Sequence, residues 1–409
     1  MHKLIAALAS LLLMASACTA GDQELPSAQP SPPAPTAAST TAQTTIPATT
    51  TTTIPPATAV LLDGIPGDLA ASVDVLLSAA STGQLANATA AFGEHVAASI
   101  QATESPVEFQ ISTGFVQEEH IAVIYSEDGD VLLAVSPDKT TWKLVGGSLP
   151  SYGVSPWYGE QLRQFYVIGS DARPGEHPLK FRADSHHIIT LWPDGSGGSI
   201  VGIPRDTYVE TPEGTHGKFT NVMASQGPER VVATATILTG IEFEGYAVTG
   251  FKGFVGMIDE LGGFEFDAPL AMSDDNAKAY FSAGLQFMTG TAVLAYSRVR
   301  KTIAGGDFTR QFHHGLIMQW ALKAVQLQGI DTLPRNMEIF ARWGWTDLTA
   351  EEFLTISALT FELDPFALTN HVMDGYPASA GGASVVFLDE GYEELFASLA
   401  EEPWTPPEE

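Results

Sequence analysis

The fold is decided by residues 163–206, in which three extended runs are separated by short motifs that carry charge. The runs are residues 165–168, 187–191 and 200–203. The motifs are Gly169-Ser170-Asp171-Ala172-Arg173, Arg182-Ala183-Asp184-Ser185 and Ile203-Pro204-Arg205-Asp206. Runs of β-branched and aromatic residues bounded by Gly, Pro, Asp and Ser are typical of β-strands. The stretch therefore predicts three strands whose ends hold charged side chains.

Strand and helix patterns alternate after this stretch. Helical spacing of apolar residues covers 229–238, 254–261 and 308–328, and extended runs occupy 246–250 and 264–266. Strands alternating with helices favour an α/β fold in which helices cover a sheet. We expect this larger unit to begin near Glu160.

A smaller unit is expected before it, at residues 61–158. Apolar residues recur at helical spacing from Leu69 to Ile100, and extended runs follow at 107–115, 120–125, 131–135 and 141–145. The turns at 127–130 and 137–138 suggest hairpins. The pattern predicts a small α+β accessory domain with no catalytic constellation. A packing or spacer role is the simpler interpretation, and binding of a glycan or a partner is the alternative.

The N-terminus has the order of an export signal. Lys3 precedes an apolar run at residues 4–14, which is short for a membrane span, and small residues then lead to Cys18. Cys18 is the only cysteine of the chain. Its position resembles that of the lipid-modified cysteine of a bacterial lipoprotein signal, which would occupy residues 1–18. Ordinary cleavage after Ala17 and retention as an uncleaved anchor are the alternatives.

Residues 19–60 are rich in Thr and Pro and contain no Lys or Arg, so they predict a disordered linker. An extended linker of this length would lift the folded part on the order of 100 Å from a membrane. Residues 397–409 predict an acidic, Pro-rich tail.

The net charge and the positions of the charged residues indicate which classes of partner to expect. The net charge is −29, so a nucleic-acid partner is not expected, because phosphate backbones are bound by Lys and Arg. Yet 13 of the 19 Lys and Arg residues lie between Arg163 and Arg310. This concentration of cations in one unit predicts an anionic ligand.

Several of these residues suit a diphosphate. Asp171 and Asp184 are hard oxygen ligands at adjoining strand ends, and two such carboxylates suit Mg²⁺, with Mn²⁺ as the alternative. Arg298 and Arg300 would project to one side of an extended segment and fork onto phosphate oxygens. Asp307 is expected to cap a helix that presents Arg310 and His314 on the same face. The simpler interpretation of each motif alone is a turn, a cap or a surface pair.

Two histidine pairs raise the question of zinc. They are His186-His187 and His313-His314. Adjacent residues point to opposite faces of a strand or lie about 100° apart on a helix, so neither pair suits one metal ion.

Taken in order, the motifs resemble the LytR-CpsA-Psr family of cell-wall glycopolymer transferases. Besides the three motifs of residues 169–206, the resemblance includes Lys218-Phe219-Thr220-Asn221, Tyr296-Ser297-Arg298-Val299-Arg300 and Gly306-Asp307-Phe308-Thr309-Arg310. It covers residues 160–396. It implies an α-β-α fold with a central mixed β-sheet flanked by helices. His313 and His314 depart from the family, which usually has Arg and Gln there.

The resemblance also implies a function. An extracytoplasmic, membrane-tethered phosphotransferase would move a glycopolymer phosphate from a polyprenyl-diphosphate donor to a peptidoglycan sugar hydroxyl. Its implied catalytic residues are Asp184, Arg205, Arg298, Arg300, Asp307 and Arg310, with Asp171 and Asp184 holding the metal. The implied substrate-binding residues are Arg173, Arg182, Lys218, Asn221 and His314. Either Asp184 or Asp307 would take the hydroxyl proton.

The same residues give three further expectations. A phosphate contact by His314 predicts tighter binding at acidic pH, since imidazole charges near a pKa of about 6.5. The apolar residues at 231–238 and 248–258 form core or line a lipid tunnel. The competing functions are a non-catalytic wall- or lipid-phosphate-binding lipoprotein with a regulatory role and a polyprenyl-diphosphate hydrolase.

Overall fold

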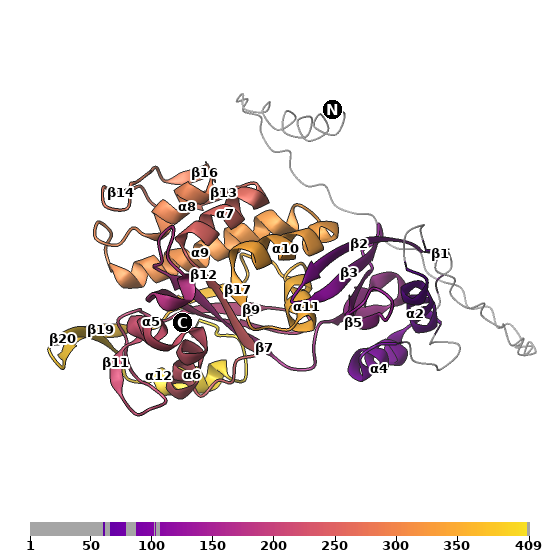
Figure 1. Cartoon of the computed structure of the whole chain (residues 1–409), viewed down its shortest axis with the longest axis horizontal. Coiled ribbons are helices and arrows are strands. Elements are labelled where there is room, and N and C mark those ends of the chain that lie inside the picture. Colours follow the sequence, from indigo (N-terminus) through magenta and orange to yellow (C-terminus); the bar gives the residue numbers. More distant parts are fainter. Residues whose placement is uncertain (1–59, 62–65, 79–86, 102, 104–106, 407–409) are drawn as a thin grey trace, which may run out of the picture. The chain divides into compact units, whose positions relative to one another are not determined.

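Alternating apolar side chains build the first of two six-stranded sheets (Figure 1). The computed structural model describes residues 60–61, 66–78, 87–101, 103 and 107–406. The strands of the first sheet, in spatial order, are β1 (Val60–Leu61), β2 (Glu108–Val116), β3 (Glu119–Ser126), β4 (Val131–Ser136), β5 (Lys143–Leu149) and β6 (Val154–Trp157). From β2 to β6 each strand pairs antiparallel with the next, which confirms the predicted hairpins.

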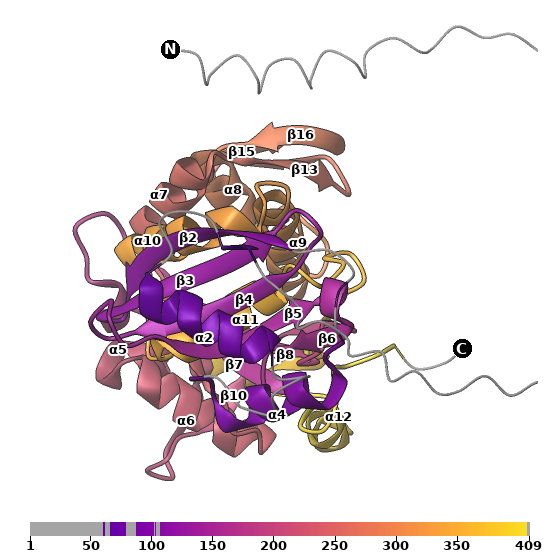
Figure 2. The same cartoon turned by 90° about the vertical axis from the view of Figure 1, so that its right-hand side faces the viewer.

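Helices cover one face of this sheet. The helical pattern of residues 69–100 forms α2 (Gly67–Leu77) and α4 (Ala90–Ser99), so the single pattern corresponds to two helices. Figure 2 shows α2 lying across the strands. Leu69, Leu76 and Phe92 pack there with Phe109 and Leu132 of the sheet. This side therefore has an apolar core of its own.

The second sheet has the order β17 (Trp345–Thr346), β12 (Gly245–Thr249), β7 (Arg163–Ser170), β8 (Ala183–Leu191), β9 (Gly198–Gly202) and β18 (Thr369–Val372). The pairs β12–β7 and β9–β18 are parallel, and the other neighbours are antiparallel. The sheet is mixed, and helices flank it on both sides (Figure 1). The predicted fold class is confirmed.

Successive side chains of β7 enter different cores. Tyr166 and Ile168 pack on one face, whereas Phe165 and Val167 pack on the other. The helices that contribute to the first of these cores are α5 (Val222–Gln226), α6 (Pro228–Thr239) and α12 (Tyr392–Leu399). The remaining helices are α7 (Phe251–Leu261), α8 (Gly290–Ser297), α9 (Asp307–Gln326), α10 (Leu333–Trp343) and α11 (Ala350–Leu359). The middle of β7 is thus buried between two largely apolar cores.

Short ribbons and turns complete the described fold. The ribbons are β10 (Tyr208–Glu210) with β11 (His216–Lys218), β13 (Phe264–Ala268) with β16 (Gly284–Met288), β14 (Met272–Asp274) with β15 (Ala279–Phe281), and β19 (Gly375–Ala380) with β20 (Ala383–Leu388). Single 3₁₀ turns are η1 (Pro150–Tyr152), η2 (Pro178–Lys180), η3 (Phe219–Asn221) and η4 (Ile330–Thr332).

The two sheets share a hydrophobic core. Val123 and Leu133 of the first sheet belong to the same buried cluster as Leu354 of α11 and Ile189 of the second sheet. Met337 of α10 joins them. The first sheet is thus packed against the larger unit through α10 and α11. The division at residues 158 and 160 stays a prediction.

The described part of the expected C-terminal tail packs on the second sheet. The Trp404 ring stacks on His371 of β18 with centroids 4.2 Å apart, and the Trp404 backbone N–H donates to Ser199 Oγ. The expected signal peptide, Cys18 and residues 19–59 of the expected linker lie outside the described residues. In the described part of the chain, no helix has both the length and the apolar character needed to cross a membrane.

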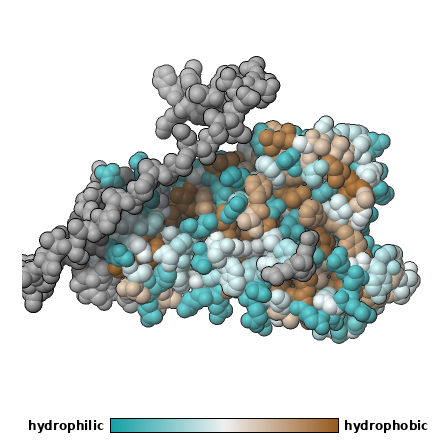
Figure 3. All heavy atoms as spheres, turned by 180° about the vertical axis from the view of Figure 1, so that it is seen from behind, coloured by the Kyte–Doolittle hydropathy of each residue, from teal (hydrophilic) through white to brown (hydrophobic). Residues whose placement is uncertain are grey.

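The visible surface mixes polar and apolar side chains. Brown, apolar patches lie among teal residues on the face in Figure 3. Leu285 and Phe287 on β16 are 65% and 58% exposed. Single exposed apolar residues are common on soluble folds, so they carry no functional argument by themselves.

Candidate active site

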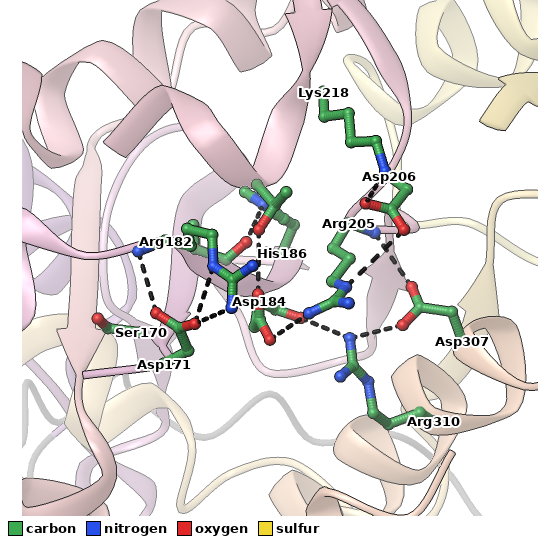
Figure 4. Close-up of polar contacts among 12 residues, drawn as sticks. Ser170, Asp171, Arg182, Asp184, His186, Arg205, Asp206, Lys218, Asp307 and Arg310 are labelled. Carbon is green, nitrogen blue, oxygen red and sulfur yellow. Dashed lines mark hydrogen bonds and ion pairs between the residues drawn. The ribbon is translucent and has the colours of Figure 1, made fainter. Parts of the chain in front are cut away.

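The hairpin of β7 and β8 brings Asp171 and Arg182 together. The backbone N–H of Asp171 donates to the Arg182 carbonyl at 3.0 Å, and Arg182 Nε donates to Asp171 Oδ2 at 2.9 Å. The hydrogen bond with this carboxylate raises the pKa of Arg182. Figure 4 shows the pair at the edge of a larger charged cluster, which also contains Asp184, Arg205, Asp307 and Arg310. The strand register therefore sets this part of the site.

Asp184, the second residue of β8, faces the end of the neighbouring strand β9. Arg205 follows β9 and forms an ion pair with Asp184, whose other oxygen accepts from Thr220 Oγ1 at 3.0 Å. Both side chains of the ion pair are mostly buried, at 15% and 21% exposure. Charge-assisted hydrogen bonds of this kind fix the orientation of both groups.

The start of α9 supplies the opposite side of the cluster. Gly305 and Gly306 have φ values of +74° and +57°, which favour glycine, and they turn the chain into the helix. Asp307 follows as its first residue. Its carboxylate lies 2.6 Å from Arg310 Nη2 and accepts from the backbone N–H of Arg205 at 3.2 Å. The expected N-cap role of Asp307 is wrong, because Gly306 holds that position.

Arg310 is the most enclosed cation of the cluster. It is 7% exposed, and its Nη2 donates to the Asp184 carbonyl at 2.9 Å (Figure 4). Burial lowers its pKa. The Nε atoms of Arg205 and Arg310 are buried without an acceptor among the described residues. Asp307 Oδ1 is likewise buried without a hydrogen-bond donor from the described part of the chain, although it lies 2.6 Å from Arg310 Nη2.

The charged cluster forms part of the wall of a cavity of about 320 Å³. Its charged lining residues are Asp171, Arg173, Arg182, Asp184, Arg205, Asp274, Arg298, Arg300, Lys301 and Arg310. Its apolar lining includes Val167, Phe251, Phe254, Leu294, Ile317 and Met318. Of the residues expected to form core or a lipid tunnel, Phe251 and Phe254 line this cavity, whereas Val231, Val248 and Ile258 are core. One cavity therefore offers both a cationic and an apolar surface.

Arg298 and Arg300 reach the cavity by a different route from the expected one. Arg298 follows α8 and keeps nearly helical backbone angles of −99° and −9°, so the expected extended segment is wrong. Its guanidinium lies 5.1 Å from the centroid of the Phe251 ring. Both arginines nevertheless line the same cavity.

Three expected site residues do not line the cavity. Lys218 pairs with Asp206 at 3.2 Å, and Asn221 is exposed at the end of η3. Asp307 contacts Arg205 and Arg310, which both line the cavity, but does not line it itself. Lys218 and Asn221 thus lie outside the wall of this cavity, and their expected ligand contacts stay a prediction. Of the two candidate bases, only Asp184 forms part of its wall.

His314 has a structural role in the cavity wall. Its Nδ1 lies 2.9 Å from Ser185 Oγ and its Nε2 lies 2.7 Å from the Ser297 carbonyl. Burial holds its pKa well below the usual range, so the imidazole remains neutral in mild acid. These contacts and the lowered pKa argue against the predicted strengthening of a phosphate contact at acidic pH. His314 instead joins the end of β8 to the end of α8.

A second histidine meets the same serine. His187 Nδ1 lies 3.1 Å from Ser185 Oγ, and its Nε2 lies 3.1 Å from the Gln311 carbonyl. Sequence reasoning considered only adjacent histidines and missed this meeting of β8 and α9. The alternation of β8 places Ser185 and His187 on one face, which is the signal that could have revealed it.

The donors for Mg²⁺ fit the chemistry of the site. Asp171 and Asp184 line one cavity, and each carboxylate oxygen that accepts one hydrogen bond keeps a further lone pair. The described residues contain no group of three His, Cys, Asp or Glu side chains suited to a metal. Mg²⁺ often uses one or two carboxylates, with water and substrate phosphate completing its shell. Two carboxylates in a cavity that is also lined by arginines meet that requirement.

Solved structures share the fold. The crystal structure of Bacillus subtilis TagV aligns with a TM-score of 0.52 and 23% identity, covering 61% of this chain and all of that one. The structure of gbs0355 from Streptococcus agalactiae aligns with a TM-score of 0.53 and 18% identity, covering 60% and 90%. At these identities the likeness shows the fold alone.

Sequence comparison is more specific. A Bacillus anthracis protein named polyisoprenyl-teichoic acid–peptidoglycan teichoic acid transferase TagU is 34% identical over 158 residues, or 38% of this chain and 50% of the relative. Bacillus subtilis TagV, named in the same way, is 33% identical over 139 residues, or 32% and 36%. The chain thus matches half or less of these curated relatives. The LytR_cpsA_psr family model matches residues 159–389, and the chain belongs to that family.

Proposed function

We propose that this chain transfers a glycopolymer phosphate from a polyprenyl-diphosphate donor to a sugar hydroxyl of peptidoglycan. One observation carries the proposal: a single cavity has both a cluster of arginines and an apolar wall. A polyprenyl diphosphate has the same two parts, an anionic head and a hydrocarbon chain. The names of the TagU and TagV relatives, which state transfer of teichoic acid to peptidoglycan, support the same class of reaction.

The arginines divide into two groups. Arg298 and Arg300 line the cavity without a carboxylate partner among the described residues, so they are free to bind the diphosphate. Arg205 and Arg310 are held in place by Asp184 and Asp307. Cations oriented before the substrate arrives stabilise charge on a transferring phosphoryl group without further reorganisation.

The transfer step needs a proton acceptor. The oxygen of the sugar hydroxyl attacks the phosphorus next to the glycopolymer, and the bond from that phosphorus to the bridging oxygen breaks. Polyprenyl phosphate leaves with the bonding electrons, and a carboxylate takes the hydroxyl proton. Asp184 is the better placed of the two candidates because it lines the cavity. Asp307 then acts as a positioning residue for Arg205 and Arg310.

Asp171 and Asp184 would hold Mg²⁺ when the ion is bound, and the ion would neutralise part of the diphosphate charge. Cys18, outside the described residues, would anchor the chain to the outer face of the cell membrane as a lipoprotein.

Arg298→Ala in the full-length chain tests the proposal. The measurement is transfer of a radiolabelled lipid-diphosphate-linked glycopolymer to peptidoglycan, with Mg²⁺ present. We expect a loss of about 100-fold or more in the rate, because Arg298 would supply a cation to the reacting diphosphate. Arg342→Ala is the matched control, because Arg342 is 56% exposed and pairs with Glu260 away from the cavity.

Three outcomes would count against the proposal. Equal rates for Arg298→Ala and the parent chain would refute the site. Release of polyprenyl phosphate without any labelled peptidoglycan would favour the hydrolase. Retention of bound donor without turnover, with acceptor and Mg²⁺ supplied, would favour the binding lipoprotein.

A further inference from the structure

Two ribbons next to the charged cluster join into one surface, which is exposed at His216 and Tyr376 and half-buried at Tyr208 and Phe387. The backbone N–H of Val386 on β20 donates to the Asp206 carbonyl at 2.8 Å, and Thr207 bridges to Val386. The ribbon β19–β20 is thereby joined to the segment that leads from Arg205 into β10. Figure 1 shows β11, β19 and β20 on the same side of the described fold.

The register of β10–β11 gathers polar and aromatic side chains on one face. Tyr208 lies opposite Lys218, and Glu210 lies opposite His216. Residues two apart on a strand share a face, so these four side chains lie together. Val209 points the other way and is buried in the core. The core therefore fixes which face of the ribbon is turned outward.

The second ribbon extends this surface with two more rings. Tyr376 and Phe387 are direct partners across β19–β20 and share a face. The Tyr208 and Phe387 centroids lie 5.3 Å apart, and the Tyr208 and His216 centroids lie 5.6 Å apart. Tyr376 lies 6.1 Å from Phe387 and is 54% exposed. We call Tyr208, His216, Tyr376 and Phe387 the aromatic platform.

The platform adjoins the reacting groups. Tyr208 is three residues from Arg205, which places their Cα atoms within about 11 Å of one another. On the same face, Lys218 contacts Asp206, whose other oxygen lies 4.0 Å from Arg205 Nε (Figure 4). None of the four platform residues lines the cavity. The platform is thus a separate surface beside the site.

We propose that the aromatic platform binds the sugar rings of the acceptor glycan. The C–H face of a pyranose ring carries partial positive charge and packs on the negative face of an aromatic ring. Glu210 and His216 supply an acceptor and a ring N–H for hydroxyl and acetamido groups at the rim of the platform. This inference rests on the proposed transfer to peptidoglycan and names the surface that receives its acceptor.

The chemistry of the platform separates the acceptor from the donor. The cavity presents Arg298, Arg300 and Arg205 and suits a diphosphate. On the platform face, by contrast, the one lysine is already paired with Asp206, and Glu210 adds negative charge. That balance disfavours a polyanion and favours an uncharged amino-sugar oligomer.

Calorimetric titration of the full-length chain with an N-acetylglucosamine tetrasaccharide tests the platform by measuring the affinity for this sugar. We expect Tyr376→Ala and Tyr208→Ala each to weaken binding about tenfold, since truncation of an aromatic anchor typically has an effect of that size. Tyr280→Ala is the matched control, because Tyr280 is 62% exposed on β15 and belongs to neither the platform nor the cavity wall. It should bind the tetrasaccharide like the parent chain.

A second titration, with geranylgeranyl diphosphate, separates this inference from the proposed function. Tyr376→Ala should keep the parent affinity for this probe, whereas Arg298→Ala should lose it and keep the tetrasaccharide. No tetrasaccharide binding by the parent chain, or equal binding by Tyr376→Ala and Tyr208→Ala, would overturn the platform. Failure of the parent chain to bind the diphosphate would instead overturn the proposed function and leave the platform standing.

Discussion

Helices pack on both six-stranded sheets, but the two sheets differ in the number and position of their Lys, Arg and Asp side chains. The first sheet has every residue of β4 buried, and its only Lys and Arg residues are Lys139 and Lys143. The second sheet is equally buried in its middle, yet Asp171, Asp184 and Arg205 stand where its strands begin or end. In this chain, buried side chains hold the sheets together, whereas the charged residues next to the strand ends form the candidate site.

The difference separates stability from ligand binding. Replacing an apolar residue of the first sheet should reduce stability with little effect on the affinity of the remaining folded protein. Replacing a charged residue at an end of the second sheet should do the reverse. The shared core, which includes Leu133 and Leu354, is where the two effects meet.

Leu133→Ala should give the largest change in stability. Leu133 is fully buried in the shared core, so truncation leaves a cavity and costs about 2–5 kcal/mol of unfolding free energy. Because the core joins both sheets, denaturant unfolding should show one transition, shifted as a whole. Leu327→Ala, at a residue 76% exposed, should change stability by less than about 0.5 kcal/mol. Two separate transitions, only one of them shifted, would show that the sheets unfold independently.

Asp307→Asn tests the other side of the comparison. The amide preserves the size of the side chain but removes the negative charge 2.6 Å from Arg310. We expect a loss of about 100-fold in transfer rate, because Arg310 loses the partner that orients it. A fall in kcat together with a rise in donor KM would indicate positioning. Asp128→Asn, in an exposed turn of the first sheet, should leave both constants unchanged.

The sequence predicted the longer strands and helices of the two sheets better than it predicted the short ribbons. Strands β2, β3, β7, β8 and β9 follow from runs of apolar and β-branched residues, and α9 follows from its helical spacing. The family resemblance, carried by residues 169–310, is confirmed. Short ribbons such as β10–β11 were missed, because three residues per strand give too little pattern to separate them from loops.

Within the site, the sequence identified the charged residues better than their partners. It predicted that Arg205 and Arg310 belong together, but it did not reveal that Lys218 pairs with Asp206. It also assigned His314 to the ligand, whereas both ring nitrogens are held by protein atoms. Such pairings depend on tertiary distance, which residue types and spacing along the chain do not determine.

Three buried histidines, two on β8 and one on α9, should make the folded chain less stable in acid. Burial lowers the pKa of His186 to about 3, and those of His187 and His313 to about 4. As the pH falls below about 6.5, the unfolded chain takes up these protons and the native chain does not, so stability falls. His313→Gln removes one such group. Its unfolding free energy relative to the parent chain should improve by about 2 kcal/mol between pH 7 and pH 5.

Denaturant melts of both proteins at pH 7, 6 and 5 measure this difference. Parallel losses of stability in the parent chain and in His313→Gln would mean that the imidazole of His313 takes up its proton in the folded state as readily as in the unfolded one. That result would contradict the burial of His313 beside Tyr296.

Lys143→Ala should have the smallest effect, although it breaks a contact between the first sheet and α11. Lys143 Nζ lies 2.6 Å from Glu351 Oε2, but the two side chains are 44% and 35% exposed. Water and salt screen such a pair, so we expect a change of less than about 0.5 kcal/mol in unfolding free energy. A double-mutant cycle with Glu351→Ala measures the coupling. A coupling above about 1 kcal/mol would mean that charge, and not only the shared apolar core, holds the first sheet to the second.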